Sequence, residues 1–376
     1  MGASFPKVIH VTTAHPRDDV RITTKFANFC ARLGDSELIV CDGLPDESVD
    51  GVKITGLVKR HSRFARMLLA PFDCLRELRK KKDRCVVHLH DPELLVAALF
   101  MRQLGYTVIF DLHEDLIDQV ISKPYLHHRV ALATYYVTRI LYPLFLRTAN
   151  VHIAATHAIS EAYERRLGCK ILTVYNYVMQ NETRVPGSYS PKGTQVVYTG
   201  AINEIRGIFR MLTIAAALPE GWKLVLAGRF RTESVKTRAM HHPGWQRTVY
   251  LGQVTREQVR EIYAQSAAGL VLFDKQPNHM ESLPNKMFEY MGNALPCIAT
   301  DIPRWQELVE GNGVGICVPD GDDAEMLQKV LAYLKDNSLR SEHAFNGATL
   351  VHEKFTWEPQ FEAYANLVRS LQSSRT

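Results

Sequence analysis

The sequence predicts an α/β protein with two doubly wound domains, each a parallel sheet covered by helices, facing one another across a cleft. Short apolar runs rich in β-branched residues alternate with stretches of helical spacing, and this alternation occurs twice along the 376 residues. Strands that are apolar along their whole length suit parallel sheets that are buried on both faces. A chain of this length is also long enough to bury two separate cores.

Each half of the chain contains six predicted strands. In the first half they lie at 8–11, 38–40, 86–89, 108–110, 151–155 and 171–174. In the second half they lie at 196–199, 223–227, 249–251, 269–273, 297–300 and 314–318. Helical spacing of apolar residues separates them, most clearly at 21–33, 92–104, 208–218, 255–264, 284–291 and 323–335. This strand–helix order is the one that a doubly wound sheet requires.

The two halves meet at a polar segment, residues 180–193, which is rich in proline, glycine and serine. We therefore predict an N-terminal domain over 1–185 and a C-terminal domain over 190–357. Ligands of open parallel sheets bind at the carboxyl ends of the strands, so the binding site is expected in a cleft between the two domains.

Composition favours a soluble protein of the cytoplasm. Hydrophobic residues make up 46% of the chain and charged residues 23%, as in ordinary globular proteins. The seven cysteines are scattered without Cys-x-x-Cys spacing, so neither a disulfide framework nor a structural zinc site is predicted. The first apolar run breaks at His10, which makes it too short and too polar for a signal peptide or a membrane span.

The net charge of +5 is concentrated in one stretch. Residues 59–84 hold ten basic and three acidic side chains, so this stretch carries +7 and the rest of the chain about −2. That argues against a nucleic-acid partner and favours one anionic contact. Its apolar residues, with further aromatic and basic ones at 126–147, are typical of an interfacial helix on the anionic inner face of a membrane. The alternative is a buried apolar face with solvated charges.

The most informative segment runs from 279 to 301. Glu281 and Glu289 are separated by seven residues, and Pro284 between them suits the first turn of a helix. The free N–H groups and positive dipole end of such a helix suit a diphosphate. A lysine such as Lys286 is disfavoured in the first turn, because the N-terminal end of the helix dipole is positive. A neighbouring anion would offset this repulsion.

This segment resembles the E-x7-E element of the GT-B glycosyltransferase family 4, and its SLPNK-FEYM form resembles enzymes of surface-polysaccharide assembly. Other segments resemble the family in matching order. Residues 108–116 resemble its strand that ends in a histidine, here His113, and 196–207 contain a basic residue before a glycine. The resemblance covers nearly the whole chain. The further segments are 171–178, 223–230, 249–266, 314–327 and 355–368. It implies the GT-B fold, with the last helix, about 358–376, packing back on the first domain.

The resemblance also implies roles for the donor site. Glu289 would hold the ribose of a nucleotide, Glu281 the hydroxyls of the donor sugar, and His113 would face that sugar. Arg206 and Lys286 would neutralise the diphosphate as it leaves. Further donor contacts would come from Ser282, Leu283, Gly200, Arg229 and Val254. The alternatives are solvated helix charges for the two glutamates, a surface lysine, and an arginine that caps a strand–helix turn.

Two departures from the family pattern concern the loops after the first strands. Ala201 stands where many members have an arginine, and residues 15–22 replace the usual glycine pair. These residues are nevertheless expected to face the cleft, as acceptor contacts or as a plain polar loop. The candidate acceptor-side residues are His15, Arg17, Asp19 and Arg21.

We therefore expect a transferase that moves a sugar from a nucleotide diphosphate sugar, most commonly UDP in this family, to a lipid-linked or surface glycan. Two fixed cations and a helix dipole can replace a divalent metal, so no metal or cofactor is expected. The E-x7-E resemblance favours retention at the anomeric carbon, with the donor diphosphate helping to deprotonate the acceptor.

Two other functions stay open. A nucleotide-sugar epimerase of the same fold could use His113, Glu114 and Asp115 as acid and base. A metal-dependent hydrolase could use His88 and His90, because side chains two apart share one face of a strand. Asp320 and Asp322 match the Asp-x-Asp motif of metal-dependent transferases, but a turn and helix cap is the favoured interpretation.

Overall fold

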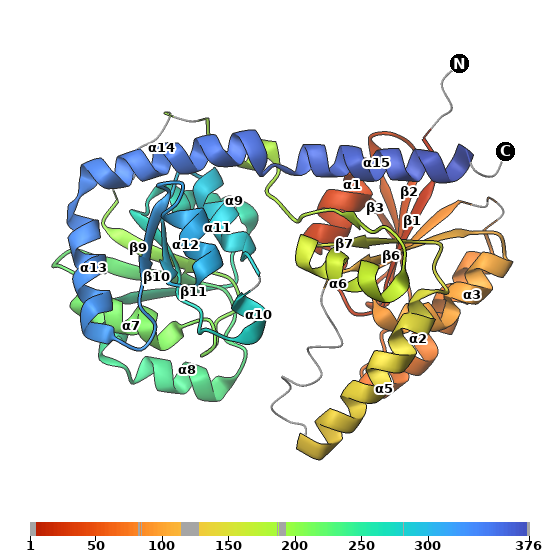
Figure 1. Ribbon diagram of the computed structural model, residues 1–376, viewed down its shortest axis with the longest axis horizontal. Coiled ribbons are helices and arrows are strands. Elements are labelled where there is room, and N and C mark those ends of the chain that lie inside the picture. The colour runs from red at the N-terminus through yellow and green to blue at the C-terminus, as the bar shows by residue number, and fades with distance from the viewer. Residues whose placement is uncertain are drawn as a thin grey trace. The chain divides into compact units, whose positions relative to one another are not determined.

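The computed structural model describes residues 5–81, 83, 85–113, 128–185, 187, 193–280 and 282–373 (Figure 1). The chain forms two compact units. Unit 1 comprises Met1–Asn176 together with Trp357–Thr376, and unit 2 comprises Tyr177–Thr356. The chain therefore leaves unit 1 before the polar segment at 180–193 and returns to it with the last helix. Each unit has its own sheet, and the predicted fold of two parallel-sheet α/β domains is confirmed.

Unit 1 is an eight-stranded sheet in the order β3-β4-β2-β1-β5-β6-β7-β8. All neighbouring pairs are parallel except β3 and β4. The strands are β1 Val8–Thr12, β2 Ser36–Val40, β3 Glu47–Val49, β4 Val52–Gly56, β5 Val86–Leu89, β6 Thr107–Leu112, β7 Val151–Ala154 and β8 Leu172–Thr173. The chain turns in opposite directions from β1 and β5, so the strand order reverses between them.

The β3–β4 hairpin was not predicted. Its two strands are short, and all three residues of β3 are exposed, so neither strand gives a strong apolar run. They are joined by Asp50 and Gly51, whose φ angles are 50° and 82°. An Asp-Gly pair with positive φ at both residues is the preferred two-residue hairpin turn.

The helices of unit 1 cover both faces of its sheet. They are the π-helix η1 Val20–Ala27, α1 Asn28–Ala31, α2 Arg63–Arg79, the short η2 Pro92–Leu94, α3 Leu95–Gln103, α5 His128–Leu146, α6 His157–Leu167 and α15 Trp357–Ser373. The helix predicted at 21–33 is therefore a π-helix that continues into α1. The rings of Trp357 and Tyr364 on α15 lie 5.1 and 4.8 Å from the ring of Phe26, which packs the last helix on η1.

Unit 2 is a six-stranded, fully parallel sheet in the order β11-β10-β9-β12-β13-β14. Its strands are β9 Gln195–Thr199, β10 Lys223–Ala227, β11 Thr248–Gly252, β12 Ala268–Val271, β13 Cys297–Thr300 and β14 Gly315–Val318. Six predicted strands therefore appear, two of them with the predicted bounds. The strand order reverses between β9 and β12, and a doubly wound sheet opens its ligand crevice at such a point.

The helices of unit 2 include each of those predicted. They are η3 Gln180–Glu182, α7 Ile208–Ala217, α8 Glu233–Met240, η4 Pro243–Arg247, α9 Arg256–Ala264, α10 Pro277–Met280, α11 Asn285–Gly292, α12 Pro303–Val309, α13 Asp323–Lys335 and α14 Asn337–Lys354. Within the described residues of both units, no helix combines the length and apolarity needed to cross a membrane.

Candidate functional site

The candidate donor site of unit 2 lies where its strand order reverses. Gly200 follows β9 directly and has a φ of +130°, which favours glycine. A Cβ added to Gly200 would lie 3.4 Å from Lys286 Cε and 3.7 Å from Arg206 Nη1. The Tyr198 hydroxyl would lie 3.6 Å away. The two cations predicted to neutralise a diphosphate therefore converge on one glycine.

Gly207 holds Arg206 in this position. Its φ is +79°, and an added Cβ would lie 1.8 Å from Leu272 O, so a side chain at this residue would push the loop away from the end of β12. The backbone N–H of Arg206 donates to Asn203 Oδ1 at 2.9 Å. Its guanidinium lies over the Phe273 ring, 5.5 Å from the centroid. The half-buried arginine is thereby fixed by both its backbone and its side chain.

Lys286 and Glu289 form an ion pair on α11. Lys286 Nζ lies 2.5 Å from Glu289 Oε2, three residues along the helix. The anion that the first-turn lysine requires is thus present in the protein itself, and it is the predicted ribose-binding glutamate. Both side chains are half-buried, so the pair is in contact with solvent and its partners can change when an anion binds.

Tyr263 on α9, which the sequence analysis missed, orients Glu289. Its hydroxyl donates to Glu289 Oε2 at 3.2 Å and lies 2.5 Å from Thr199 Oγ1 at the end of β9. Burial and the charge of Glu289 raise the pKa of the Tyr263 hydroxyl well above its usual range, so it remains a donor at neutral pH. No local sequence signal identifies this tyrosine, because its role depends on the packing of α9 beside β9.

The other predicted donor-site residues lie on loops of unit 2. Ser282 O accepts a hydrogen bond of 2.7 Å from Nε1 of the buried Trp305, which anchors the loop before α11, and Leu283 follows it, half-buried. Arg229 is exposed, and Val254 is half-buried in the loop between β11 and α9. Glu281 lies outside the described residues.

The Asp-x-Asp sequence at 320–322 is a turn and cap, as favoured. Asp322 Oδ1 accepts from the backbone N–H of Glu325 at 3.0 Å and caps α13. Asp320 accepts from the backbone N–H of Lys275 at 3.2 Å and lies 3.4 Å from Arg210 Nη1. Both carboxylates therefore hold the loops beside β14.

In unit 1, the carboxyl end of β6 carries a buried ionic network centred on Asp111. Arg21 binds both oxygens of its carboxylate at 2.8 Å. His113 Nδ1 lies 3.1 Å from Asp111 Oδ2, while its Nε2 lies 2.6 Å from His90 O. Burial alone would raise the pKa of Asp111, but the charges of Arg21 and His113 hold it well below the usual value. The carboxylate is therefore ionised and paired.

A second pair lies beside this network. His15 Nδ1 is 3.1 Å from Asp91 Oδ1, and Asp91 also accepts from Thr12 Oγ1 and the Thr13 N–H, each at 2.7 Å. Burial would lower the pKa of His15, but the hydrogen bond and charge of Asp91 outweigh this and raise it. His15 keeps 34% of its side chain exposed, so it can still meet a ligand.

The remaining acceptor-side candidates have structural partners. Arg17 binds Asp42 at 2.6 and 2.9 Å and Glu47 at 2.6 Å, which ties the loop after β1 to β3. Asp19 accepts from the backbone N–H groups of Arg21 and Ile22 and caps η1. Contact with an acceptor stays a prediction for all four residues. Of the four, Arg21 is the most buried, and it is paired with the buried Asp111.

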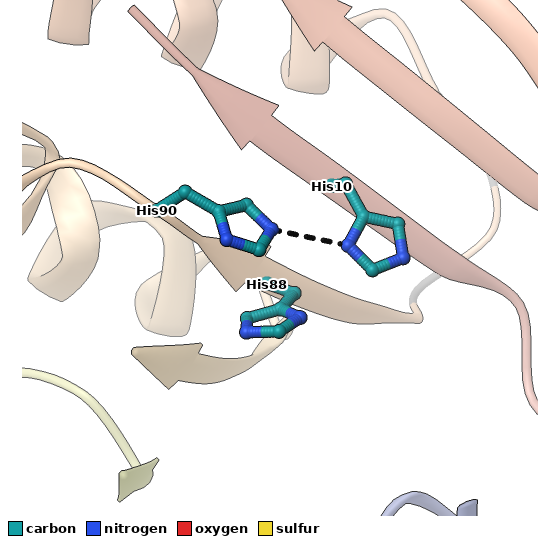
Figure 2. A group of neighbouring side chains, drawn as sticks. All are labelled: His10, His88 and His90. Atoms are coloured by element: carbon teal, nitrogen blue, oxygen red, sulfur yellow. Dashed lines mark hydrogen bonds between the residues drawn. The ribbon is translucent and has the colours of Figure 1, made fainter. Parts of the chain in front are cut away.

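His88 and His90 share one face of the sheet with His10, as Figure 2 shows. His10 Nδ1 lies 3.2 Å from His90 Nε2, and His88 Nδ1 lies 3.0 Å from the Tyr364 hydroxyl. The ligand atoms of the three imidazoles lie within 4.8 Å of one another, so they could hold a cation. All three rings are fully buried, and burial lowers their pKa values. They pack as neutral rings between the sheet and α15.

Comparison with known proteins agrees with this geometry. The family model "Glycosyltransferase Family 4" matches residues 20–179, and "Glycosyl transferases group 1" matches residues 193–336. The chain is 22% identical over 313 residues to N-acetyl-alpha-D-glucosaminyl L-malate synthase of Bacillus anthracis, an alignment that covers 78% of this chain and 76% of that protein.

Among solved structures, sucrose-phosphate synthase from Thermosynechococcus elongatus has a TM-score of 0.75 and 15% identity, covering 98% of this chain and 99% of that one. Anabaena HepE in complex with UDP and glucose has a TM-score of 0.70 and 13% identity, covering 97% of this chain and 100% of that one. The chain is a glycosyltransferase of the two-domain GT-B fold, with a family 4 domain in its first half and a group 1 domain in its second.

Proposed function

We propose that this glycosyltransferase moves a sugar from UDP-sugar to a lipid-linked or surface-glycan acceptor, with retention at the anomeric carbon and without a metal ion. The observation that carries the proposal is the convergence of Arg206 and Lys286 on Gly200. A diphosphate seated there meets two cations and the N-terminal end of α11, whose free N–H groups and dipole favour an anion.

Binding of the diphosphate would change the partners of the charged side chains in this arrangement. When the diphosphate binds, Lys286 gains a second anionic partner, while Glu289 remains hydrogen bonded to Tyr263 and accepts the ribose hydroxyls. At about 4 Å and an effective dielectric near 20, one such charge pair amounts to roughly 4 kcal/mol. Only the part that grows as the diphosphate leaves accelerates the reaction, so each cation is expected to contribute about 10²–10³ in rate.

The remaining roles rest on resemblance to family 4. Glu281 binds the hydroxyls of the donor sugar, His113 faces that sugar, and the leaving diphosphate takes the acceptor proton. The choice of UDP is supported by HepE, which was solved with UDP and glucose. The choice of a glycan acceptor is supported by the resemblance of the 279–301 segment to surface-polysaccharide enzymes. We place the reaction on the cytoplasmic face of a membrane.

Thermal melting of the chain with UDP, GDP and ADP, and with their common sugars, tests the donor. A nucleotide that binds the folded state raises the melting temperature by mass action, and UDP is expected to give the largest rise. Equal shifts for the three nucleotides would contradict the choice of UDP.

Two further measurements test the chemistry. Proton NMR of the first-formed product reports its anomeric configuration, and inversion would contradict retention. Turnover in EDTA is expected to equal turnover in Mg²⁺. A loss of activity that Mg²⁺ restores would contradict the metal-free mechanism, and a donor that is epimerised without transfer would favour the alternative isomerase.

A further inference from the structure

Three neighbouring helices of unit 1 expose apolar side chains on their solvent side. In Figure 1, α2, α3 and α5 lie together, and α3 packs against both of the others. The α2 helix buries Ala70, Cys74 and Leu78 on one side. It also exposes five apolar side chains, which are those of Phe64, Met67, Leu68, Leu69 and Phe72. The helix therefore leaves apolar side chains in solvent in addition to those that the fold buries.

The other two helices repeat this pattern. Ile140 and Leu144 of α5 are 65% and 54% exposed, although Tyr142 and Leu146 on the same helix are buried. Val96, Leu99 and Phe100 of α3 are exposed as well. We call the exposed apolar side chains of these helices the α2–α3–α5 face. Single exposed apolar residues are common, but a group spread over three packed helices marks an interaction surface.

The charges around this face select its partner. Arg76 and Arg79 of α2, Arg102 of α3 and Arg139 of α5 are all exposed. The sequences of α3 and of α5 contain no acidic residue. The two acidic residues of α2, Asp73 and Glu77, are each neutralised by an ion pair with a basic residue. The partner must therefore be apolar and negatively charged.

Part of the basic stretch at 59–84 is used by the fold instead. Arg66 binds Glu93 at 2.9 Å, and Lys81 pairs with Glu37. Two basic side chains of the predicted membrane segment at 59–84 therefore have partners within the fold. The α3 helix lies outside both 59–84 and 126–147, the segments predicted from the sequence. Lys82 and Arg84 lie outside the described residues.

We infer that the α2–α3–α5 face docks on an anionic lipid bilayer, with its apolar side chains in the acyl boundary and its arginines among the headgroups. Arginine suits this position, because its aliphatic stem can lie along apolar surface while the guanidinium reaches a phosphate. A second copy of the chain fits less well, since a two-fold contact would bring the same arginines of both copies together.

The biological use of this surface rests on the proposed lipid-linked acceptor, but its test does not. Co-sedimentation of the full chain is measured with vesicles of phosphatidylcholine alone and of phosphatidylcholine and phosphatidylglycerol in equal amounts, without donor or acceptor. We expect binding to the anionic vesicles only, decreasing with salt. Absence of binding to them, or equal binding to both kinds, would overturn the inference.

Matched variants separate the apolar and charged contributions. Phe72 and Phe345 are 49% and 50% exposed, and Phe345 lies on α14 of unit 2. Phe72→Ser should reduce vesicle partitioning about tenfold, because a phenylalanine ring no longer enters the acyl boundary. Phe345→Ser should leave it unchanged. Equal effects of the two substitutions would contradict docking through this face.

The second test reverses the charge of two arginines on the α2–α3–α5 face. Arg76→Glu with Arg79→Glu should reduce partitioning by about 25-fold or more, since each lost charge accounts for roughly a factor of five. The exposed Arg260 and Lys335 of unit 2 provide the control, as Arg260→Glu with Lys335→Glu makes the same change in net charge. If the control pair reduces partitioning equally, net charge rather than this face controls binding.

Two readouts keep the outcomes distinct. Light scattering of the free chain tests for a dimer, and a dimer that Phe72→Ser dissociates would assign the face to self-association and overturn bilayer docking. Melting with UDP tests the donor site separately. If vesicles bind while no nucleotide shifts the melting temperature, docking stands and the proposed donor chemistry fails.

Discussion

The two units place charged side chains at the carboxyl ends of their sheets, but they balance these charges differently. In unit 1, Asp111 is buried and held by Arg21 and His113, so its network is complete within the fold. In unit 2, Arg206 and Lys286 lie around Gly200, and the one carboxylate paired with either of them among the described contacts is that of Glu289.

This difference separates structural from ligand-binding charge. In a buried ion pair, the charges and hydrogen-bonding groups of the two side chains are used by each other. Such a pair stabilises the backbone around it and has little positive charge left to bind an anion. A half-buried cluster with excess positive charge attracts an anionic ligand, and a diphosphate is such a ligand.

Removal of Arg21 should have the largest effect, which is a loss of stability in unit 1. Arg21→Met leaves the buried Asp111 carboxylate with an unpaired charge, which typically costs about 3–5 kcal/mol. Hydrogen exchange of the amides of β1 and β6 measures the free energy of opening in unit 1. Arg76→Met, at an exposed arginine, is the control. A loss below about 1 kcal/mol for Arg21→Met, where solvated surface pairs fall, would show that the network of unit 1 is not structural.

Removal of either cation in unit 2 should affect catalysis instead. Lys286→Ala and Arg206→Ala are each expected to lower kcat by about 10²–10³, because the charge developing on the leaving diphosphate loses a fixed partner. Steady-state kinetics with a saturating donor measure this, and melting in the absence of ligand should change little.

The charge-conserving variant Arg206→Lys sharpens the same test. It should recover part of the lost kcat if the charge near Gly200 is what matters. An Arg206→Ala enzyme with an unchanged kcat and a raised KM would assign the arginine to ground-state binding and remove it from the transition state.

Much of the fold followed from the sequence, because its strands are continuous apolar runs. The predicted strands at 223–227 and 297–300 have the observed bounds. The β3–β4 hairpin escaped because β3 lies at the edge of the sheet with all its residues exposed, and because the buried Val52 and Ile54 of β4 are separated by a lysine. Parallel pairing of β1 with β5 gathers His10 and His88, and no local pattern reveals that register.

The candidate site was predictable in part for a related reason. Lys286 and Glu289 lie on one helix, three residues apart, so their proximity is local. Arg206 lies near them because the strand order reverses between β9 and β12. Its place in the donor site was implied by the resemblance to family 4. Tyr263 could not be found in this way, since it reaches Glu289 through tertiary packing alone.

Removal of the Tyr263 hydroxyl should have an intermediate effect. Tyr263→Phe deletes the hydrogen bond to Glu289, and a hydrogen bond to a charged group contributes about 1.5–3 kcal/mol. Because Glu289 keeps Lys286, we expect the lower end of this range, about a tenfold weaker affinity for the nucleotide, with kcat nearly unchanged. Calorimetric titration with UDP measures it, and Tyr250→Phe on β11 is the control. A reduced kcat at unchanged affinity would contradict a positioning role.

The smallest effect should come from His15, and it should depend on pH. The pKa of His15 is raised above its ordinary value of 6.5 by Asp91, although burial opposes this. A raised pKa in the folded state stabilises the protein below the ordinary value, and this stabilisation is lost as the pH rises through the raised pKa. His15→Gln should therefore destabilise unit 1 in mildly acidic solution and have less effect at alkaline pH. Since a third of the side chain is exposed, the difference should be about 1 kcal/mol or less. Urea unfolding at several pH values measures it, and a difference that grows with pH would show that His15 is not held by Asp91.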